Sequence, residues 1–359
     1  MFIIYVLANS FVLVVYNHHM FWEVFYAILL LLTGIGVFLV GIIKFSNVLQ
    51  SSNNDRIKKY FEKLGNNRAK GFALGAGATT IIQSSTATTV ITVGLVNAGI
   101  ITFAQSTAVV FGANVGTALS NMLISLSAFR IKYFFMVLVF VGAFSKILVA
   151  KPKVHKVADV LIAFGIIFVG LEIMSIAFRN NDALVDLFSK LFNTVQFPLL
   201  LVLIGFILAA IMNSSTAATA LLITFAANGA LTFISIMFLF IGIKLGTTLT
   251  TLIASIPASR CAKRVAVMHL LFNVFGALIF LPIIWSLQNQ ISSAFTTAIP
   301  SAVWQISVFG LVYAFTTAII LLFFIKPMNK LAYKIVPEKP EQITIAEHIE
   351  DFHGFTKDF

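Results

Sequence analysis

One pattern of small and hydroxyl-bearing residues occurs twice in this chain, at a constant separation of 130 positions. The stretch QSSTATT at 83–89 returns as NSSTAAT at 213–219. Without a gap, the same offset aligns GANVGT at 112–117 with GIKLGT at 242–247. A chance resemblance between apolar segments would not keep small and polar residues in register over such a length. The chain is therefore predicted to contain two structural repeats.

Apolar segments separated by short polar loops account for most of the sequence. A membrane span needs about 20 apolar residues, so these segments can supply roughly eight to ten crossings or re-entrant pieces. Hydrophobic residues make up 59% of the chain and charged residues only 10%, whereas about 25% of a soluble domain is charged. The fold class is therefore predicted to be an all-α polytopic membrane protein. The apolar segments lie at 1–16, 24–45, 71–97, 101–126, 132–150, 157–178, 197–227, 231–256, 264–286 and 301–326.

The loops between these segments differ in charge, and basic loops mark the cytoplasmic side of a membrane. The loop 46–70 carries six Lys and Arg residues against two acids, and the loop 151–156 carries three lysines. Basic and acidic residues balance in the loop 179–196. Segment 24–45 therefore runs toward the cytoplasm, whereas its counterpart 157–178 starts there. The two repeats are predicted to have inverted topology, with both termini of the chain in the cytoplasm.

The inverted orientation also predicts a broken or re-entrant helix in each repeat. The paired segments 71–97 and 101–126, like their counterparts 197–227 and 231–256, must together make an odd number of crossings. The two Ser/Thr-rich stretches lie beside glycines that weaken helix continuity, so they are the predicted breaks. Freed backbone groups are tolerated in a bilayer only where protein or a water-filled cavity covers them. Inverted repeats, broken helices and a site near the midplane are typical of secondary transporters.

The chain then divides into membrane segments with one polar appendage. The C-terminal tail holds six of the 13 acidic residues, but it is too short to form a domain. The predicted organisation is a short N-terminal span at 1–23, the first membrane repeat at 24–150, the second at 157–286, a terminal transmembrane helix at 301–326 and a cytoplasmic tail at 337–359.

The two Ser/Thr clusters are candidate binding sites, because polar groups inside a bilayer are costly unless they are satisfied. Where a helix breaks, the N–H groups at the start of the next half-helix favour an anion. Freed carbonyl and hydroxyl oxygens favour a hard monovalent cation such as sodium. The alternative is that the hydroxyls only join helices by hydrogen bonds, but two clusters at equivalent positions favour binding. The predicted substrate ligands are Gln83, Ser84, Ser85, Thr86, Asn213, Ser214, Ser215 and Thr216, and the predicted sodium ligands are Thr88, Thr89, Asn114, Thr117, Thr219 and Thr247.

The second aligned motif differs between the repeats at one position. In the first repeat, Asn114 can offer an amide oxygen to a cation, whereas Gly112 and Gly116 have the GxxxG spacing of a helix-packing face. In the second repeat, Lys244 replaces the asparagine, more than two helical turns from the nearest loop. Its ammonium either pairs with a bound anion or takes the place of a cation. Lys244 is therefore predicted to modulate ion binding, while Glu172, nearer a segment end, is predicted to be interfacial.

Other classes of function lack their sequence signals. The chain has no Walker A motif and no Cys/His set with zinc spacing. His269 has no obvious serine partner, so we expect neither an enzyme nor a cofactor, and this histidine is expected to serve packing. The formal charge of +11 lies mostly in loops without interleaved aromatic residues, which argues against nucleic-acid binding. A carrier of another small anion, and a membrane scaffold or sensor that transports nothing, stay as alternatives.

The doubled motifs resemble those of the type II sodium/phosphate cotransporter family, over about 24–286. The resemblance implies sodium-coupled symport of inorganic phosphate by alternating access, in a bacterial inner membrane. The expected partners are phosphate, sodium, the lipid bilayer and a second copy of the chain. A separate regulatory protein is a further expected partner, because this chain ends before the PhoU-like domain of many bacterial members. Asn213 and Lys244 depart from the usual glutamine and asparagine of the family. The resemblance is carried by Gln83 to Thr88, Gly112 to Thr117, Asn213 to Thr219, Gly242 to Thr248 and HLLFN at 269–273.

Overall fold

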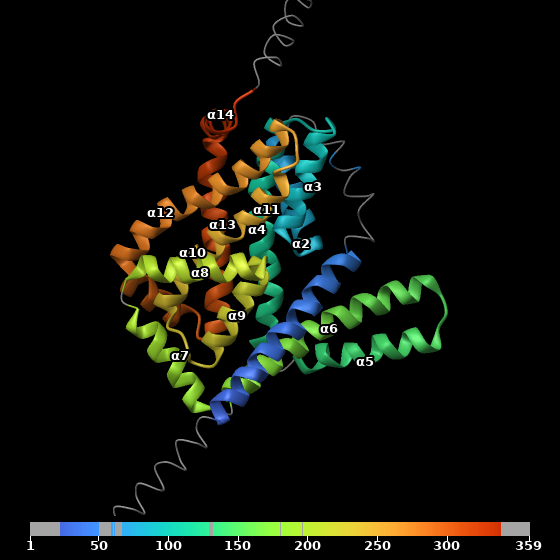
Figure 1. Ribbon diagram of the computed structural model, residues 1–359, viewed down its shortest axis with the longest axis vertical. Helices are drawn as coiled ribbons and strands as arrows, with labels where there is room; N and C mark the ends of the chain where they lie inside the picture. Colours follow the sequence, from blue (N-terminus) through green and yellow to red (C-terminus); the bar gives the residue numbers. More distant parts are fainter. Residues whose placement is uncertain are drawn as a thin grey trace, which may run out of the picture.

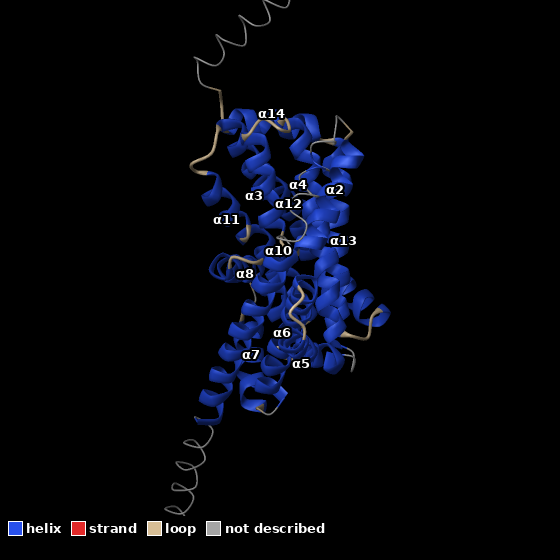
Figure 2. Ribbon diagram, turned by 90° about the vertical axis from the view of Figure 1, so that its right-hand side faces the viewer, coloured by secondary structure: helices blue, strands red, loops and turns tan. Residues whose placement is uncertain are grey.

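The computed structural model describes residues 22–49, 59, 61, 67–128, 132–179, 181–195 and 197–338. Helices joined by short loops make up this described part (Figures 1 and 2). Six of its helices are long and apolar enough to cross a membrane, so the predicted class, an all-α polytopic membrane protein, is confirmed. The expected span at 1–16 and nearly all of the tail at 337–359 lie outside the described residues.

The helices follow the order of the two repeats. The first repeat contains the helix Trp22–Leu49, α2 (Arg68–Ile82), α3 (Ser85–Asn97), α4 (Phe103–Ile124), the 3₁₀ helix η1 (Ser125–Ala128) and α5 (Lys132–Leu148). The second contains α6 (Pro152–Arg179), α7 (Asp182–Thr194), α8 (Pro198–Met212), α9 (Ser215–Ala227), α10 (Phe233–Gly246), α11 (Thr248–Ser255) and α12 (Arg260–Ala298). The chain continues as α13 (Ala302–Phe323) and α14 (Ile325–Ile335).

The helix boundaries of the two repeats coincide at the offset found in the sequence. The helix Trp22–Leu49 corresponds to α6, α2 to α8 and α3 to α9, and each pair begins and ends 130 residues apart. The helices α4 and α10 also begin 130 residues apart, at Phe103 and Phe233. They differ at the other end, because α10 stops at Gly246 and α11 completes the same span.

Both predicted helix breaks are present. Gln83 and Asn213 adopt left-handed backbone conformations, with φ of 62° and 50°, and they are the non-glycine residues with positive φ among those described. A left-handed residue ends a helix because it turns the chain that follows away from the helix axis; the N–H of Gln83 itself still donates to the carbonyl of Thr79 at 2.7 Å. The next residue, Ser84 or Ser214, is extended, and its hydroxyl accepts a hydrogen bond from the N–H three residues later. Each hydroxyl therefore caps the following helix.

The helices on either side of each break are too short to cross a bilayer alone. The helices α2 and α8 have 15 residues and α3 and α9 have 13, compared with about 20 for a complete span. Each of the pairs α2–α3 and α8–α9 is therefore a broken unit. A glycine with positive φ, Gly99 or Gly229, follows each unit and turns the chain into α4 or α10.

Glycines hold each broken unit against the span that follows it. A Cβ atom on Gly112 would collide with the carbonyl oxygen of Phe72, and a Cβ on Gly242 would collide with that of Val202. The helices α2 and α4, like α8 and α10, thus approach each other backbone to backbone, as small residues allow in membranes. The packing interpretation of the GxxxG spacing is therefore correct for both repeats.

The remaining helices surround this centre. The helices α5 and α6 form a hairpin that projects sideways with the helix Trp22–Leu49 alongside (Figure 1). The interior of the molecule contains α4, α9 and α10, whose side chains are mostly buried, and α13 packs against all three. Glu172 of α6 is buried between Lys132 and Arg179, with oxygen–nitrogen distances of 2.6 and 3.1 Å. Both cations lie at helix ends, Lys132 at the start of α5 and Arg179 at the end of α6, and they compensate the burial of Glu172; its interfacial position stays a prediction.

Candidate functional site

The first break places its polar tip inside the protein. Gln83 is buried, and its Nε2 donates a hydrogen bond of 2.5 Å to the carbonyl oxygen of Thr80. Its side chain lines a narrow crevice together with apolar residues of the helix Trp22–Leu49, α4 and α6. Ser85 is buried, whereas Ser84 and Thr86 are half-buried. The first tip is thus covered by neighbouring helices.

The second break has the same backbone but a more open tip. Asn213 is exposed, and its Oδ1 accepts a hydrogen bond of 3.0 Å from the hydroxyl of Thr250 in α11. Ser214 is half-buried, while Ser215 and Thr216 are buried. Asn213 therefore bonds to a polar partner outside its broken unit α8–α9, whereas Gln83 bonds back to its own helix, α2.

Each break supplies backbone N–H groups at the start of a half-helix. The first four N–H groups of a helix lack partners within it, and the hydroxyls of Ser84 and Ser214 each accept from one of them. The remaining N–H groups lie beside the hydroxyls of Ser85 and Ser215 at the two helix starts. This combination of N–H donors, hydroxyls and helix dipole favours an anion.

Two hydroxyls at equivalent positions lack a partner. Thr89 and Thr219 are buried, and within the described part of the chain neither Oγ1 atom has a hydrogen-bond partner. Most threonine hydroxyls in these helices donate to a backbone carbonyl one turn earlier, as Thr88 does to Ser84 and Thr117 to Ala113, both at 3.1 Å. Thr247 similarly donates to the carbonyl of Lys244 at 3.1 Å. Unpartnered buried polar atoms are rare and require an explanation.

A chain of buried polar side chains connects three helices, α4, α11 and α12. Asn273 of α12 donates to Oδ1 of Asn114 in α4 at 3.4 Å and to the carbonyl of His269 at 2.9 Å. Nδ1 of His269 lies 3.1 Å from the hydroxyl of Thr251 in α11. Oδ1 of Asn273 is buried without a partner among the described residues. Asn273 and Thr251 were missed as site candidates from sequence chemistry, although His269 and Asn273 share a helix face at a spacing of four.

Lys244 is buried in α10 with 3% of its surface exposed. Its Nζ lies 5.7 Å from the centre of the Phe240 ring, a distance at which the ring attracts a cation weakly. Among the described residues, no carboxylate forms an ion pair with it. The second repeat therefore carries an uncompensated cation where the first carries Asn114.

Contacts between the repeats bring these elements into one region. The helix α3, which follows the first break, packs against α11 and α12 of the second repeat, and α9 packs against α4 of the first. The half-helix of each repeat thus lies on a span of the other. The contacts join the two repeats, but Asn213 is exposed, and in the part of the chain described no hydrogen bond joins the two Ser-Ser motifs.

The fold defines a class of protein: a multi-pass membrane protein with two broken-helix units, each of which packs with its second half-helix on helices of the other repeat. The family model described as "Na+/Pi-cotransporter" matches residues 37–176 and 181–299. The chain belongs to this family, so the resemblance inferred from the doubled motifs is confirmed.

Individual relatives are more distant. The chain is 28% identical over 289 residues to the Escherichia coli K12 protein named "Putative inorganic phosphate export protein YjbB", and 26% identical over 301 residues to its Salmonella typhimurium namesake. These matches cover 80% and 83% of this chain, but only 51% and 53% of the relatives, so the chain spans about half their length. "Uncharacterized protein YqeW" of Bacillus subtilis is 24% identical over 299 residues, 83% of this chain and 94% of that protein. No solved structure matches the chain.

Proposed function

We propose that this protein is a secondary carrier that moves inorganic phosphate together with sodium by alternating access. The observation that carries the proposal is the pair of equivalent helix breaks. At each break, one helix ends at a left-handed residue and the next helix begins after a serine cap. Family membership supports phosphate and sodium as the solutes. The same geometry could hold another small oxyanion, so the transport assay includes sulfate as a competitor.

In this proposal, the anion binds at the starts of α3 and α9. The N–H groups of both half-helices, the hydroxyls of Ser84, Ser85, Ser214 and Ser215, and the amides of Gln83 and Asn213 would surround its oxygens. Two helix dipoles would then point their positive ends at one charge, and this would compensate the loss of water around a phosphate dianion. Thr86 and Thr216 complete the predicted ligand set.

Sodium would bind beside the anion, at oxygens that the protein leaves without partners. Such oxygens are the side-chain atoms Oγ1 of Thr89, Oγ1 of Thr219 and Oδ1 of Asn273. Hydroxyl and amide oxygens are ligands that hard cations prefer. Asn114 would act indirectly, since its amide oxygen already accepts from Asn273.

The test is uptake of radiolabelled phosphate into proteoliposomes with and without a sodium gradient. We expect the double variant Ser214→Ala/Ser215→Ala to lose at least about 100-fold in kcat/KM, because two hydroxyl contacts to a charge are each worth about 1.5–3 kcal/mol. The matched control is Ser292→Ala/Ser293→Ala, which alters the half-exposed serine pair near the end of α12. Undiminished uptake in the first variant, or uptake that ignores sodium, would reject the proposal.

The names of several relatives favour a second candidate, outward movement of phosphate. A carrier by itself moves solute down the combined gradients, so direction must be measured. Proteoliposomes loaded with labelled phosphate, with sodium imposed inside or outside, separate the two cases. A reversible symporter should release phosphate under an outward sodium gradient as fast as it takes phosphate up under an inward one. Efflux that does not respond to sodium would favour a dedicated exporter.

The proposed setting is the inner membrane of a bacterium, with the basic loops and both termini in the cytoplasm. Cys261 offers a direct test, because it is the single cysteine of the chain, it is exposed, and it lies in the basic turn at the start of α12. A membrane-impermeant thiol reagent should label it in inside-out vesicles and not in spheroplasts. Labelling in spheroplasts would reverse the proposed orientation.

A further inference from the structure

The last described helix lies across the end of the membrane spans. Figure 1 shows α14 end-on, and Figure 2 shows it crossing one end of the molecule. The span α13 ends at Phe323, whose side chain is 82% exposed, and Phe324 between the two helices is also exposed. Tyr and Trp are the residues enriched at the boundary between lipid and water, and the exposed Tyr333 of α14 is one of them. The helix α14 thus has the placement of an interfacial helix.

An apolar groove opens under this helix. It has a volume of about 350 Å³ and lies between α12, α13 and α14. Its lining residues are apolar, so it offers an acyl chain a dry surface and gives water no polar partner. They include Phe275 and Ile279 of α12, Ile320 and Leu321 of α13, and Met328 and Leu331 of α14.

Three lysines border the groove. Lys326, Lys330 and Lys334 are exposed and follow one another at a spacing of four, and α14 contains no acidic residue. The helical period places them on the flank next to the groove-lining face, away from the buried residues of the helix. Among the described residues, none of the three forms an ion pair. The residues of α14 that line the groove and the three lysines without ion pairs thus lie on neighbouring faces of this helix.

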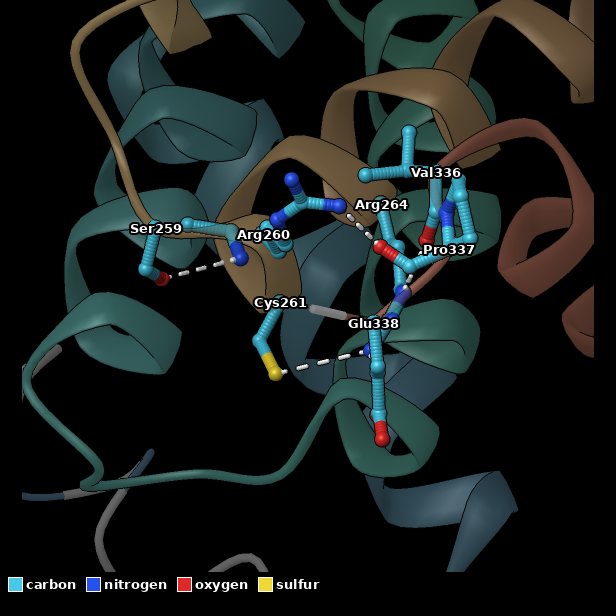
Figure 3. A network of polar contacts seen from close by, with 8 residues as sticks. Ser259, Arg260, Cys261, Arg264, Val336, Pro337 and Glu338 are labelled. Atoms are coloured by element: carbon cyan, nitrogen blue, oxygen red, sulfur yellow. Dashed lines mark hydrogen bonds and ion pairs between the residues drawn. The ribbon is translucent and has the colours of Figure 1, made fainter. Parts of the chain in front are cut away.

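The protein holds α14 firmly in this place. Arg264 of α12 is fully buried, and its Cζ atom lies 3.8 Å from the centre of the Tyr333 ring. Its guanidinium donates to the carbonyl of Val336 at 2.9 Å and to the carboxylate of Glu338 at 3.1 Å (Figure 3). At the other side, Thr107 of α4 donates to Asn329 at 2.8 Å. The groove is therefore preformed, and it rests on α12, the helix that also carries His269 and Asn273.

We propose that this groove binds an anionic phospholipid, with one acyl chain between α12, α13 and α14 and the headgroup phosphate on Lys326, Lys330 and Lys334. The charge of the lysines selects an anionic headgroup, and the apolar lining selects a lipid over free phosphate. This site is separate from the proposed transport site, and it does not depend on what the protein transports.

The test measures lipid binding to the purified full chain by native mass spectrometry in detergent. Phosphatidylglycerol and phosphatidylethanolamine with identical acyl chains are compared. We expect retention of phosphatidylglycerol, and roughly 100-fold weaker retention by Lys326→Gln/Lys330→Gln/Lys334→Gln, since each lysine near an anionic headgroup is worth about fivefold in affinity. The matched control neutralises three exposed lysines elsewhere, Lys151 just before α6 and Lys153 and Lys156 in its first turns, and should bind as the unaltered chain does.

A second variant tests the groove itself. Ile320→Trp fills the space between the helices and leaves all three lysines in place, so it should also release the lipid. An unchanged melting temperature in detergent establishes that this variant is folded. Equal retention of the two lipids, or full retention by the triple lysine variant, would overturn the proposal. Displacement of phosphatidylglycerol by millimolar inorganic phosphate would overturn it as well, because the lysines would then bind free phosphate.

Discussion

The two repeats share one backbone and differ in chemistry. Their breaks have the same left-handed residue, serine cap and helix lengths, yet Gln83 is buried against its own helix and Asn213 is exposed and bonded to Thr250. About three turns into the following span, Asn114 of the first repeat accepts a hydrogen bond from Asn273, whereas Lys244 of the second has no ionic partner among the described residues. Duplication thus preserved the scaffold, while the side chains at its polar centre diverged.

The largest expected effect concerns what the repeats share. Gly112→Ala and Gly242→Ala should each destabilise the protein by about 3 kcal/mol or more, because the new methyl group meets a backbone carbonyl oxygen that cannot move aside. Melting in detergent measures the loss. Gly77→Ala is the control, since nothing lies within 4 Å of its added Cβ. A normal melting temperature for either of the first two variants would mean that the helices do not pack backbone to backbone.

A smaller effect should come from exchanging the residues that differ in charge. If the Lys244 ammonium occupies a cation position, Lys244→Asn opens that position, and the Hill coefficient for sodium should rise by about one. Asn114→Lys should lower it. The partly exposed Lys146 on α5, which pairs with Asp159, supplies the control, Lys146→Asn, with an unchanged slope expected. Loss of phosphate affinity in Lys244→Asn at constant sodium dependence would instead assign the ammonium to the anion.

The smallest effects should separate the two tips. Gln83→Asn shortens a buried side chain and breaks its bond to Thr80, so KM for phosphate should rise about fivefold, the worth of a hydrogen bond of about 1 kcal/mol. Asn213→Gln lies at an exposed tip and should change KM by less than about twofold. Uptake kinetics in proteoliposomes measure both. Equal effects would show that the tips become equivalent during transport.

Local chemistry made much of the fold predictable. A serine after the break can cap the next helix, and this step involves only neighbouring residues. Asparagine also takes the left-handed conformation more readily than glutamine does. The breaks at Gln83 and Asn213 and the repeat offset could therefore be predicted. The burial of Glu172 could not be predicted, because it depends on Lys132 and Arg179, which are 40 and 7 positions away in the sequence.

By itself, the sequence determined that this protein is an all-helical membrane protein with two repeats, and where its helices break, since hydropathy, spacing and capping act within a turn or two of the chain. Only the tertiary structure decided that Asn273 bonds to Asn114, that the hydroxyls of Thr89 and Thr219 lack partners, and that an apolar groove with three lysines lies under α14. These features depend on which distant helices pack together, and the free energy of that packing comes from many contacts that no short motif records.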